Sequence, residues 1–172
     1  HGALGDAADL EAVDVRDDPV VLQVEAGAEG AARGGQHHHV AVVVGGHVAE
    51  GSGCNLFLVR DGALITAPIT GDILEGITRR SIILFAKDLG IPVEERVIDR
   101  SELYIADEAF FCGTGMQIAP IASVDGRPVH DGKVGPITAQ LREVFFDTVR
   151  GKNPKYSHFL TKIRIPVAAG AD

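Results

Sequence analysis

Residues 50–66 read EGSGCNLFLVRDGALIT and carry the clearest structural signal in the chain. Two apolar runs, at residues 55–59 and 64–66, stand on either side of the dipeptide Asp61-Gly62. A turn dipeptide between two apolar runs is the strongest short-range sign of a β-hairpin. We therefore predict a hairpin at this place in the chain.

A helix is predicted to follow the hairpin. After Thr78 the apolar residues Ile82, Phe85 and Leu89 recur at helical spacing, and this period favours a helix with one buried face. Gly90, with a proline two residues later, ends the helix.

The rest of the chain alternates between short strands and helices. The predicted elements are a strand at residues 93–97, a short helix at 101–106, strands at 109–112 and 117–124, and a last helix that begins at Pro136. A proline in the first turn costs that helix no hydrogen bond. The sum is a mixed α/β domain of the α+β type.

The composition is that of an ordinary globular protein and limits the partners. The chain has 172 residues, 45% of them hydrophobic, and a formal net charge of -8. This acidic balance argues against a nucleic-acid partner or an anionic membrane, and no apolar run is long enough to span a membrane. Cys54 and Cys112 stand in no metal-ligand spacing, so we predict no metal site and two reduced thiols in a cytoplasmic protein.

Residues 1–51 differ sharply from the rest. Only ten residue types occur there, and all ten have codons that begin with G or C. One hypothesis is that GC-rich DNA is translated here in a shifted or antisense frame; the alternative is a genuine Ala/Gly-rich leader. Glycine is frequent and aromatic anchors are absent, so weak structure is expected. The predicted division is a poorly structured leader at residues 1–46, a domain at 47–165 and a tail at 166–172.

Three places have the ingredients of an anion and cofactor site. The turn from Leu74 to Thr78 opens into the predicted helix, where free backbone N–H groups and the Thr78 hydroxyl would bind an anion. The glycine-bracketed turn at residues 113–115 allows close backbone approach. Glu50 puts a carboxylate beside a glycine-rich turn. Each has an ordinary alternative, respectively a helix cap, a tight turn and a surface charge.

Taken together, these places form one longer pattern. Its parts are Glu50 to Phe57, Leu64 to Thr66 and Leu74 to Arg79. Their order and spacing resemble the pattern of the class IV aminotransferases. A resemblance to the branched-chain amino acid aminotransferases continues in the segments 104–110, 112–115, 135–138 and 150–158. The resemblance covers residues 47–162. It implies the large domain of the D-amino acid aminotransferase-like fold, a short-stranded pseudo-barrel flanked by helices.

The resemblance also implies a cofactor, pyridoxal 5′-phosphate, and a role for each residue. Glu50 would pair with the pyridine nitrogen, and Leu74 would pack against the ring. The phosphate would lie at the helix start, and Thr114 would add a hydroxyl. The implied cofactor-binding set is Glu50, Leu74, Gly76, Ile77, Thr78, Gly113 and Thr114, and the substrate carboxylate would meet the backbone at Thr114 and Gly115.

One part of the family's chemistry is missing from the sequence. In the family a lysine that forms a Schiff base with the cofactor precedes the glutamate, but no lysine here precedes Lys87. The five lysines present all fall in segments that do not correspond to that site. No catalytic residue is therefore assigned.

The function that the resemblance implies is amino-group transfer between leucine, isoleucine or valine and 2-oxoglutarate, with this chain as a fragment that is inactive alone. The alternatives are a D-amino acid transaminase or aminodeoxychorismate lyase of the same fold, and a non-catalytic relic or gene-prediction artefact. The implied partners are small-molecule amino acids and 2-oxo acids and, for a complete enzyme, further copies in a homodimer or higher homo-oligomer.

Overall fold

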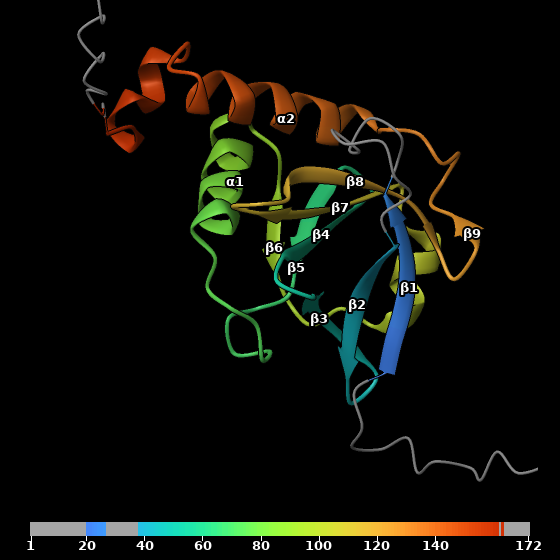
Figure 1. Cartoon of the computed structure of the whole chain (residues 1–172). Helices are drawn as coiled ribbons and strands as arrows, with labels where there is room; N and C mark the ends of the chain where they lie inside the picture. The colour runs from blue at the N-terminus through green and yellow to red at the C-terminus, as the bar shows by residue number, and fades with distance from the viewer. Residues whose placement is uncertain (1–19, 27–37, 162, 164–172) are drawn as a thin grey trace, which may run out of the picture.

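The computed structural model describes residues 20–26, 38–161 and 163. Within these residues the strands form a nine-stranded sheet in the order β3-β2-β1-β8-β7-β4-β5-β6, with β9 beside β8 (Figure 1). The strands are β1 (Val20–Ala26), β2 (His38–Val44), β3 (His47–Gly51), β4 (Asn55–Arg60), β5 (Ala63–Thr66), β6 (Val93–Glu95), β7 (Glu108–Gly113), β8 (Gln117–Val124) and β9 (Arg127–Pro128).

The predicted hairpin is confirmed. Strands β4 and β5 pair antiparallel, with Phe57 opposite Thr66. The turn between them uses Asp61 and Gly62 in the left-handed region, at φ 50° and 77°. Strand β6 pairs parallel with β5, which requires the long crossover that the intervening helix provides. It is shorter than the predicted strand and ends at Glu95.

In the described part of the chain, two α-helices pack against the central strands of the sheet. Helix α1 (Ile77–Asp88) and helix α2 (Pro136–Val149) contact each other, and both contact β7 (Figure 1). Ile82 and Phe85 of α1 are buried as predicted. The expectation for Leu89 is wrong: α1 ends at Asp88, and Leu89 is an exposed C-cap residue. The predicted short helix is the 3₁₀ helix η1 (Arg100–Ile105), and a second 3₁₀ helix, η2 (Pro154–Phe159), follows α2.

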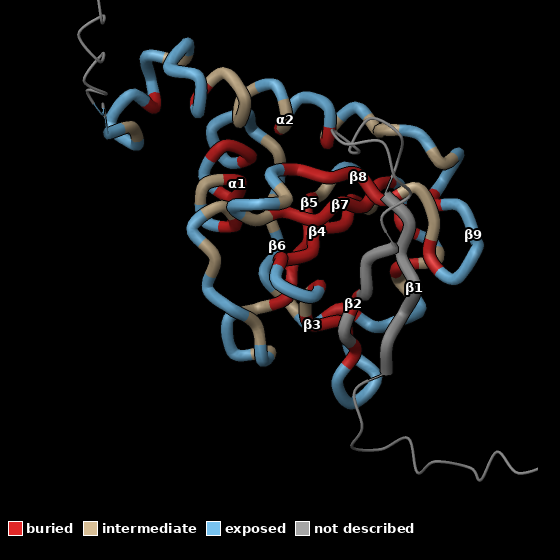
Figure 2. The backbone as a smooth tube through the Cα atoms, viewed as in Figure 1, coloured by how far each residue is buried: buried red, intermediate tan, exposed pale blue. Residues whose placement is uncertain are grey.

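The core lies on both faces of the central strands. Along β4, Leu56 and Leu58 belong to one buried cluster, whereas Phe57 and Val59 belong to the cluster that packs against α1 and α2. This alternation follows from the two-residue period of a strand. Because β4 and β7 are buried on both faces, they form the centre of the domain (Figure 2).

The sheet curls so that its first strand, β3, returns to β4. The N–H of Gly51 donates to the carbonyl of Cys54 at 2.7 Å, and the N–H of Cys54 donates to the carbonyl of Gly51 at 3.2 Å. The resulting mixed sheet with flanking helices agrees with the predicted fold class. It also brings the end of β3 next to the start of β4.

Two strands come from the expected leader. Strand β1 pairs with β8, where Val24 lies opposite Val124, and β2 pairs with β1 and β3. The expectation of weak structure therefore does not hold for residues 20–26 and 38–46. Valine-rich runs have a high β-propensity, and β8 offers a strand edge to pair with. The other leader residues and the tail lie outside the described residues, and the division into leader, domain and tail stays a prediction.

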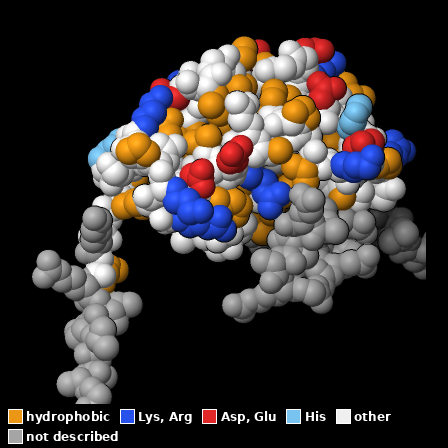
Figure 3. All heavy atoms as spheres, turned by 90° about the horizontal axis from the view of Figure 1, so that it is seen from above, with side chains coloured by type: hydrophobic (Ala, Val, Ile, Leu, Met, Phe, Trp, Pro, Cys, Tyr) orange, Lys and Arg blue, Asp and Glu red, His pale blue; other side chains and the backbone are white. Residues whose placement is uncertain are grey.

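The described part of the chain contains no helix that is long and apolar enough to cross a membrane. No cluster of histidine, cysteine or acidic side chains suited to a metal ion occurs among the described residues either. On the face seen from above, acidic and basic side chains lie among scattered hydrophobic ones (Figure 3).

Candidate functional site

Helix α1 begins at a place where its backbone N–H groups remain available. Gly76 is the N-cap, with φ −72° and ψ 136°, and no side chain caps the helix within the described residues. The first helical hydrogen bond is donated by the N–H of Arg80 to the carbonyl of Gly76, at 3.0 Å. The N–H groups of the first turn point out of the helix end, where the helix dipole favours an anion.

Helix α2 is different at its start. Glu108 of β7 accepts hydrogen bonds from the N–H of Ile137 at 3.0 Å and of Thr138 at 2.7 Å. A carboxylate from another element thus already neutralises the N-terminus of α2. Of the two α-helices in the described part of the chain, α1 is the one whose N-terminus can take an external anion.

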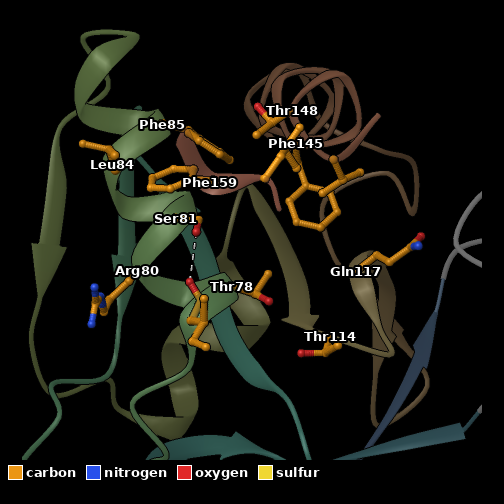
Figure 4. A pocket seen from close by; sticks show the side chains of 13 residues that line it. Thr78, Arg80, Ser81, Leu84, Phe85, Thr114, Gln117, Phe145, Thr148 and Phe159 are labelled. Atoms are coloured by element: carbon orange, nitrogen blue, oxygen red, sulfur yellow. Dashed lines mark hydrogen bonds between the residues drawn. The ribbon is translucent and has the colours of Figure 1, made fainter. Parts of the chain in front are cut away.

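A cavity of about 670 Å³ lies beside the start of α1. Thr78 of α1 and Thr114 of the turn between β7 and β8 both line it (Figure 4). We expect Glu50, Thr78 and Thr114 to converge on one cavity; the two threonines line it, whereas Glu50 is not among its lining residues. Two hydroxyls and a set of helix N–H groups form a donor set suited to a phosphate. Arg80 and Ser81 also line the cavity, and the sequence pattern had singled out neither.

Glu50 does not line this cavity, but it is tied to the segment that leads into α1. Its Oε2 accepts hydrogen bonds from the N–H of Leu74 and from Nδ2 of Asn55, both at 3.0 Å. Asn55 Nδ2 also donates to the carbonyl of Leu74, at 2.8 Å. The structure thus joins the carboxylate to the same chain segment that leads to the uncapped start of α1.

Close packing against Asn55 leaves room only for glycine at position 76. A Cβ atom at this position would collide with Oδ1 of Asn55, well inside van der Waals contact. Gly113 is less constrained, because its Cβ would lie 3.6 Å from Cβ of Cys54 and 3.5 Å from the carbonyl of Gly53. At Gly115 an added Cβ would meet nothing within 4 Å.

The two large apolar residues of the predicted site face outward. Leu74 is 72% exposed and Ile77 is 82% exposed. Exposed large apolar side chains next to a donor set can cover the apolar part of a bound molecule. Of the predicted site residues, the cavity is lined by Ile77, Thr78 and Thr114, whereas Glu50, Leu74, Gly76, Gly113 and Gly115 are not among its lining residues.

A buried arginine in the first turn of α1, Arg79, ends the sequence pattern but received no role from it. Arg79 is 1% exposed, and its Nη2 donates to the carbonyl of Ala67 and to Oε2 of Glu95, both at 2.8 Å. Its Nε has no hydrogen-bond partner within the described residues. Arg79 follows Thr78 directly, so only its position in the pattern could have signalled it.

Cys54 stands beside Glu50 as a neutral thiol. Burial, and then the nearby charge of Glu50, raises the pKa of Cys54 to about 11. Cys112 is also a free, buried cysteine, and burial raises its pKa above the usual range. Neither thiol is an activated nucleophile at neutral pH.

Comparison with known proteins gives consistent matches. The family model described as amino-transferase class IV matches residues 20–124. A probable branched-chain-amino-acid aminotransferase of Aquifex aeolicus is 49% identical over 119 residues, which are 69% of this chain and 38% of that protein. The branched-chain-amino-acid aminotransferase of Escherichia coli (strain K12) is 47% identical over 122 residues, covering 71% of this chain and 40% of that protein.

Solved structures agree with these relatives. The branched-chain amino acid aminotransferase from Thermobaculum terrenum, in its PLP form, superposes with a TM-score of 0.66 at 52% identity, over 67% of this chain and 38% of that one. The branched-chain aminotransferase from Thermoproteus uzoniensis, with norvaline, superposes with a TM-score of 0.65 at 52% identity, again over 67% and 38%. The chain thus spans about two fifths of the length of the relatives that it matches.

Proposed function

Because this chain belongs to the class IV aminotransferase family, we propose that it is the cofactor-binding part of a branched-chain amino acid aminotransferase that uses pyridoxal 5′-phosphate. The complete enzyme would transfer an amino group between leucine, isoleucine or valine and 2-oxoglutarate. One observation carries the proposal: an uncapped helix N-terminus and two threonine hydroxyls meet at one cavity, and a held carboxylate is tied to the segment that begins that helix.

The donor set fits the cofactor's phosphate. The N–H groups at Ile77 and Thr78 and the hydroxyls of Thr78 and Thr114 would hold the phosphate. Gly76 lets the chain pass so close to Asn55 that no larger residue fits there. Thr114 and Gly115 would offer their backbone to the substrate carboxylate, and Gly113 would let that turn approach closely.

The carboxylate of Glu50 fits the other end of the cofactor. It would hold a proton at the pyridine nitrogen, because an ion pair favours the charged form of both partners. Leu74, exposed beside it, would cover the ring and exclude water from one of its faces. Bound pyridoxal 5′-phosphate supplies an electron-withdrawing ring that stabilises negative charge at the α-carbon of an amino acid.

The described part of the chain offers no lysine at the cavity. The cavity lining contains none; Lys133 pairs with Asp131, and Lys155 pairs with Asp88. Lys162 lies outside the described residues. Without a positioned base, a proton transfer loses about 10²- to 10⁴-fold in rate. We therefore propose that this chain by itself binds the cofactor but does not transaminate.

The remaining parts of the proposal concern partners and location. The complete enzyme would act on small-molecule amino acids and 2-oxo acids as a homodimer or higher homo-oligomer. Two free cysteines support a reducing compartment such as the cytoplasm. The alternative functions within the fold, D-amino acid transamination and aminodeoxychorismate cleavage, have no specific observation in their favour.

Binding is tested by titrating the purified chain with pyridoxamine 5′-phosphate, which carries no aldehyde to react with surface lysines. We expect saturable binding that Thr78→Val and Thr114→Val each weaken about tenfold. A chain that binds no pyridoxamine 5′-phosphate contradicts the proposal.

Activity is tested in a chimera in which residues 47–162 replace the matching part of the Escherichia coli enzyme. We expect turnover with L-leucine and 2-oxoglutarate but none with D-alanine or aminodeoxychorismate. The unfused chain, supplied with pyridoxal 5′-phosphate, should form no glutamate from 2-oxoglutarate. Turnover by the unfused chain would contradict the statement that it lacks a working base.

A further inference from the structure

Asn55 connects the separate segments of the candidate site. It begins β4 and is 5% exposed. Its Nδ2 donates to Oε2 of Glu50 at 3.0 Å and to the carbonyl of Leu74 at 2.8 Å. An amide nitrogen has two hydrogens to donate, so these two bonds use its full capacity.

The orientation of the Asn55 amide follows from its surroundings. The two groups that face Nδ2 are the ionised carboxylate of Glu50 and the carbonyl of Leu74. Both can only accept hydrogen bonds. The amide therefore cannot be flipped, because an oxygen in that place would face two acceptors. Its Oδ1 then lies beside Gly76, in the space that a Cβ atom would enter.

The same contacts leave one oxygen of Glu50 available. Both hydrogen bonds to Glu50 end on Oε2. Among the described residues, no hydrogen bond to Oε1 of Glu50 is found. A carboxylate with one oxygen held by the protein presents the other in a fixed direction.

We propose that Asn55 is a positioning residue that sets the Glu50 carboxylate relative to the N-terminus of α1. This inference rests on the proposed function and deepens it. The cofactor is a rigid ring with a phosphate at one side and the ring nitrogen at the other. Its two anchors on the protein, the start of α1 for the phosphate and Glu50 for the nitrogen, must therefore be held at a matching separation. Asn55 touches both anchor segments through one buried amide, and it acts through Glu50 rather than on the ligand.

Other residue types would not do this. Aspartate would place a second carboxylate against Glu50, leucine would leave the carbonyl of Leu74 without a donor, and alanine would leave a gap. The side chain that reaches both acceptors needs the length and the two hydrogens of asparagine.

The test is a double-mutant cycle on the full chain. Glu50→Gln, Asn55→Leu and the double variant are titrated with pyridoxamine 5′-phosphate, which contacts both anchors, and with inorganic phosphate, which contacts the α1 end alone. Asn153→Leu is the matched control. The Oδ1 of Asn153 accepts a hydrogen bond from the N–H of Lys155 at the start of η2, and Asn153 does not line the cavity.

We expect Glu50→Gln and Asn55→Leu each to weaken pyridoxamine 5′-phosphate binding about tenfold, the loss typical of a hydrogen bond to a charged group. The double variant should bind no more than about twofold more weakly than Glu50→Gln alone, because residues that act through one another are not additive. Inorganic phosphate affinity should stay within about twofold in all variants, and Asn153→Leu should match the unchanged chain.

Two results overturn the inference while leaving the proposed function intact: fully additive losses, or an Asn55→Leu variant that binds like the unchanged chain while Glu50→Gln binds weakly. If the unchanged chain does not bind pyridoxamine 5′-phosphate at all, the proposed function and this inference both fail. If Asn55→Leu gives no cooperative thermal transition, Asn55→Ser replaces it in the same cycle and is judged by the same additivity.

Discussion

Arg79 and Glu95 form an ion pair whose two partners differ greatly in exposure. Nη2 of Arg79 lies 2.8 Å from Oε2 of Glu95, and the Arg79 side chain is 2% exposed whereas that of Glu95 is 42% exposed. The pair joins the first turn of α1 to β6. The guanidinium thus depends on a neighbour at the surface for its counter-charge.

This asymmetry predicts that replacing the exposed partner, Glu95, destabilises the fold more than replacing the buried one, Arg79. Glu95→Ala leaves a buried positive charge without its partner and should lower the free energy of unfolding by about 3 kcal/mol. Arg79→Met removes the charge, fills the space and should cost about 2 kcal/mol, mainly through the carbonyl of Ala67. Urea unfolding of both variants measures this. A larger loss for Arg79→Met than for Glu95→Ala would show that packing, and not charge, dominates.

A second prediction concerns the start of α2. Glu108 is buried and accepts from two backbone N–H groups of that helix. Glu108→Ala should lower the free energy of unfolding by about 1–2 kcal/mol, the usual cost of losing a helix cap. Glu143→Ala, at an exposed position on the same helix, is the control and should change stability by less than about 0.5 kcal/mol. Equal losses in the two variants would contradict the capping role.

A third prediction concerns the glycine that begins α1. Gly76→Ala drives a Cβ into Oδ1 of Asn55, so the backbone must shift, and overpacking of this kind costs about 1–3 kcal/mol. Thermal unfolding and pyridoxamine 5′-phosphate titration should both show a loss. Gly115→Ala enters open space and should leave stability nearly unchanged. A Gly76→Ala chain that is as stable as the original would contradict the close contact.

A fourth prediction is a loss of stability at high pH. The hydroxyl of Tyr156 donates to Oδ2 of Asp88 at 2.7 Å. Burial, followed by this hydrogen bond, raises the pKa of Tyr156 to about 12, whereas a free tyrosine titrates near 10. A group whose pKa is raised in the folded state contributes stability that is complete below its unfolded pKa and is lost as the pH rises through the folded pKa.

The stability difference between the unchanged chain and Tyr156→Phe should therefore be constant below pH about 10 and shrink between about 10 and 12. Urea midpoints measured at a series of pH values check this. A difference that stays constant up to pH 12 would mean that the Tyr156 proton is not linked to folding.

Much of the fold could be predicted because its signals are local. The hairpin at residues 55–66 follows from two apolar runs and Asp61-Gly62, and α1 follows from apolar spacing closed by Gly90. The two strands in residues 20–44 could not be predicted with the same ease, because the unusual composition of that block masks its valine runs. Strand β1 pairs with β8, which is remote in the sequence, and β2 pairs with β1.

The order of residues along the chain was sufficient to propose the residue types of the candidate site: a carboxylate at Glu50, a glycine and a threonine at the start of α1, and Thr114 between glycines. The folded arrangement was needed to find that Asn55 joins Glu50 to Leu74, that Glu95 neutralises Arg79 and that Glu108 caps α2. The contacts of Asn55 with Leu74, of Arg79 with Glu95 and of Glu108 with Thr138 link residues 16 to 30 positions apart. Asn55 and Glu50 are five positions apart and lie on the neighbouring strands β4 and β3. Periodicity records which face of an element is buried, whereas the partner of a buried polar group depends on which segments the folded chain brings together.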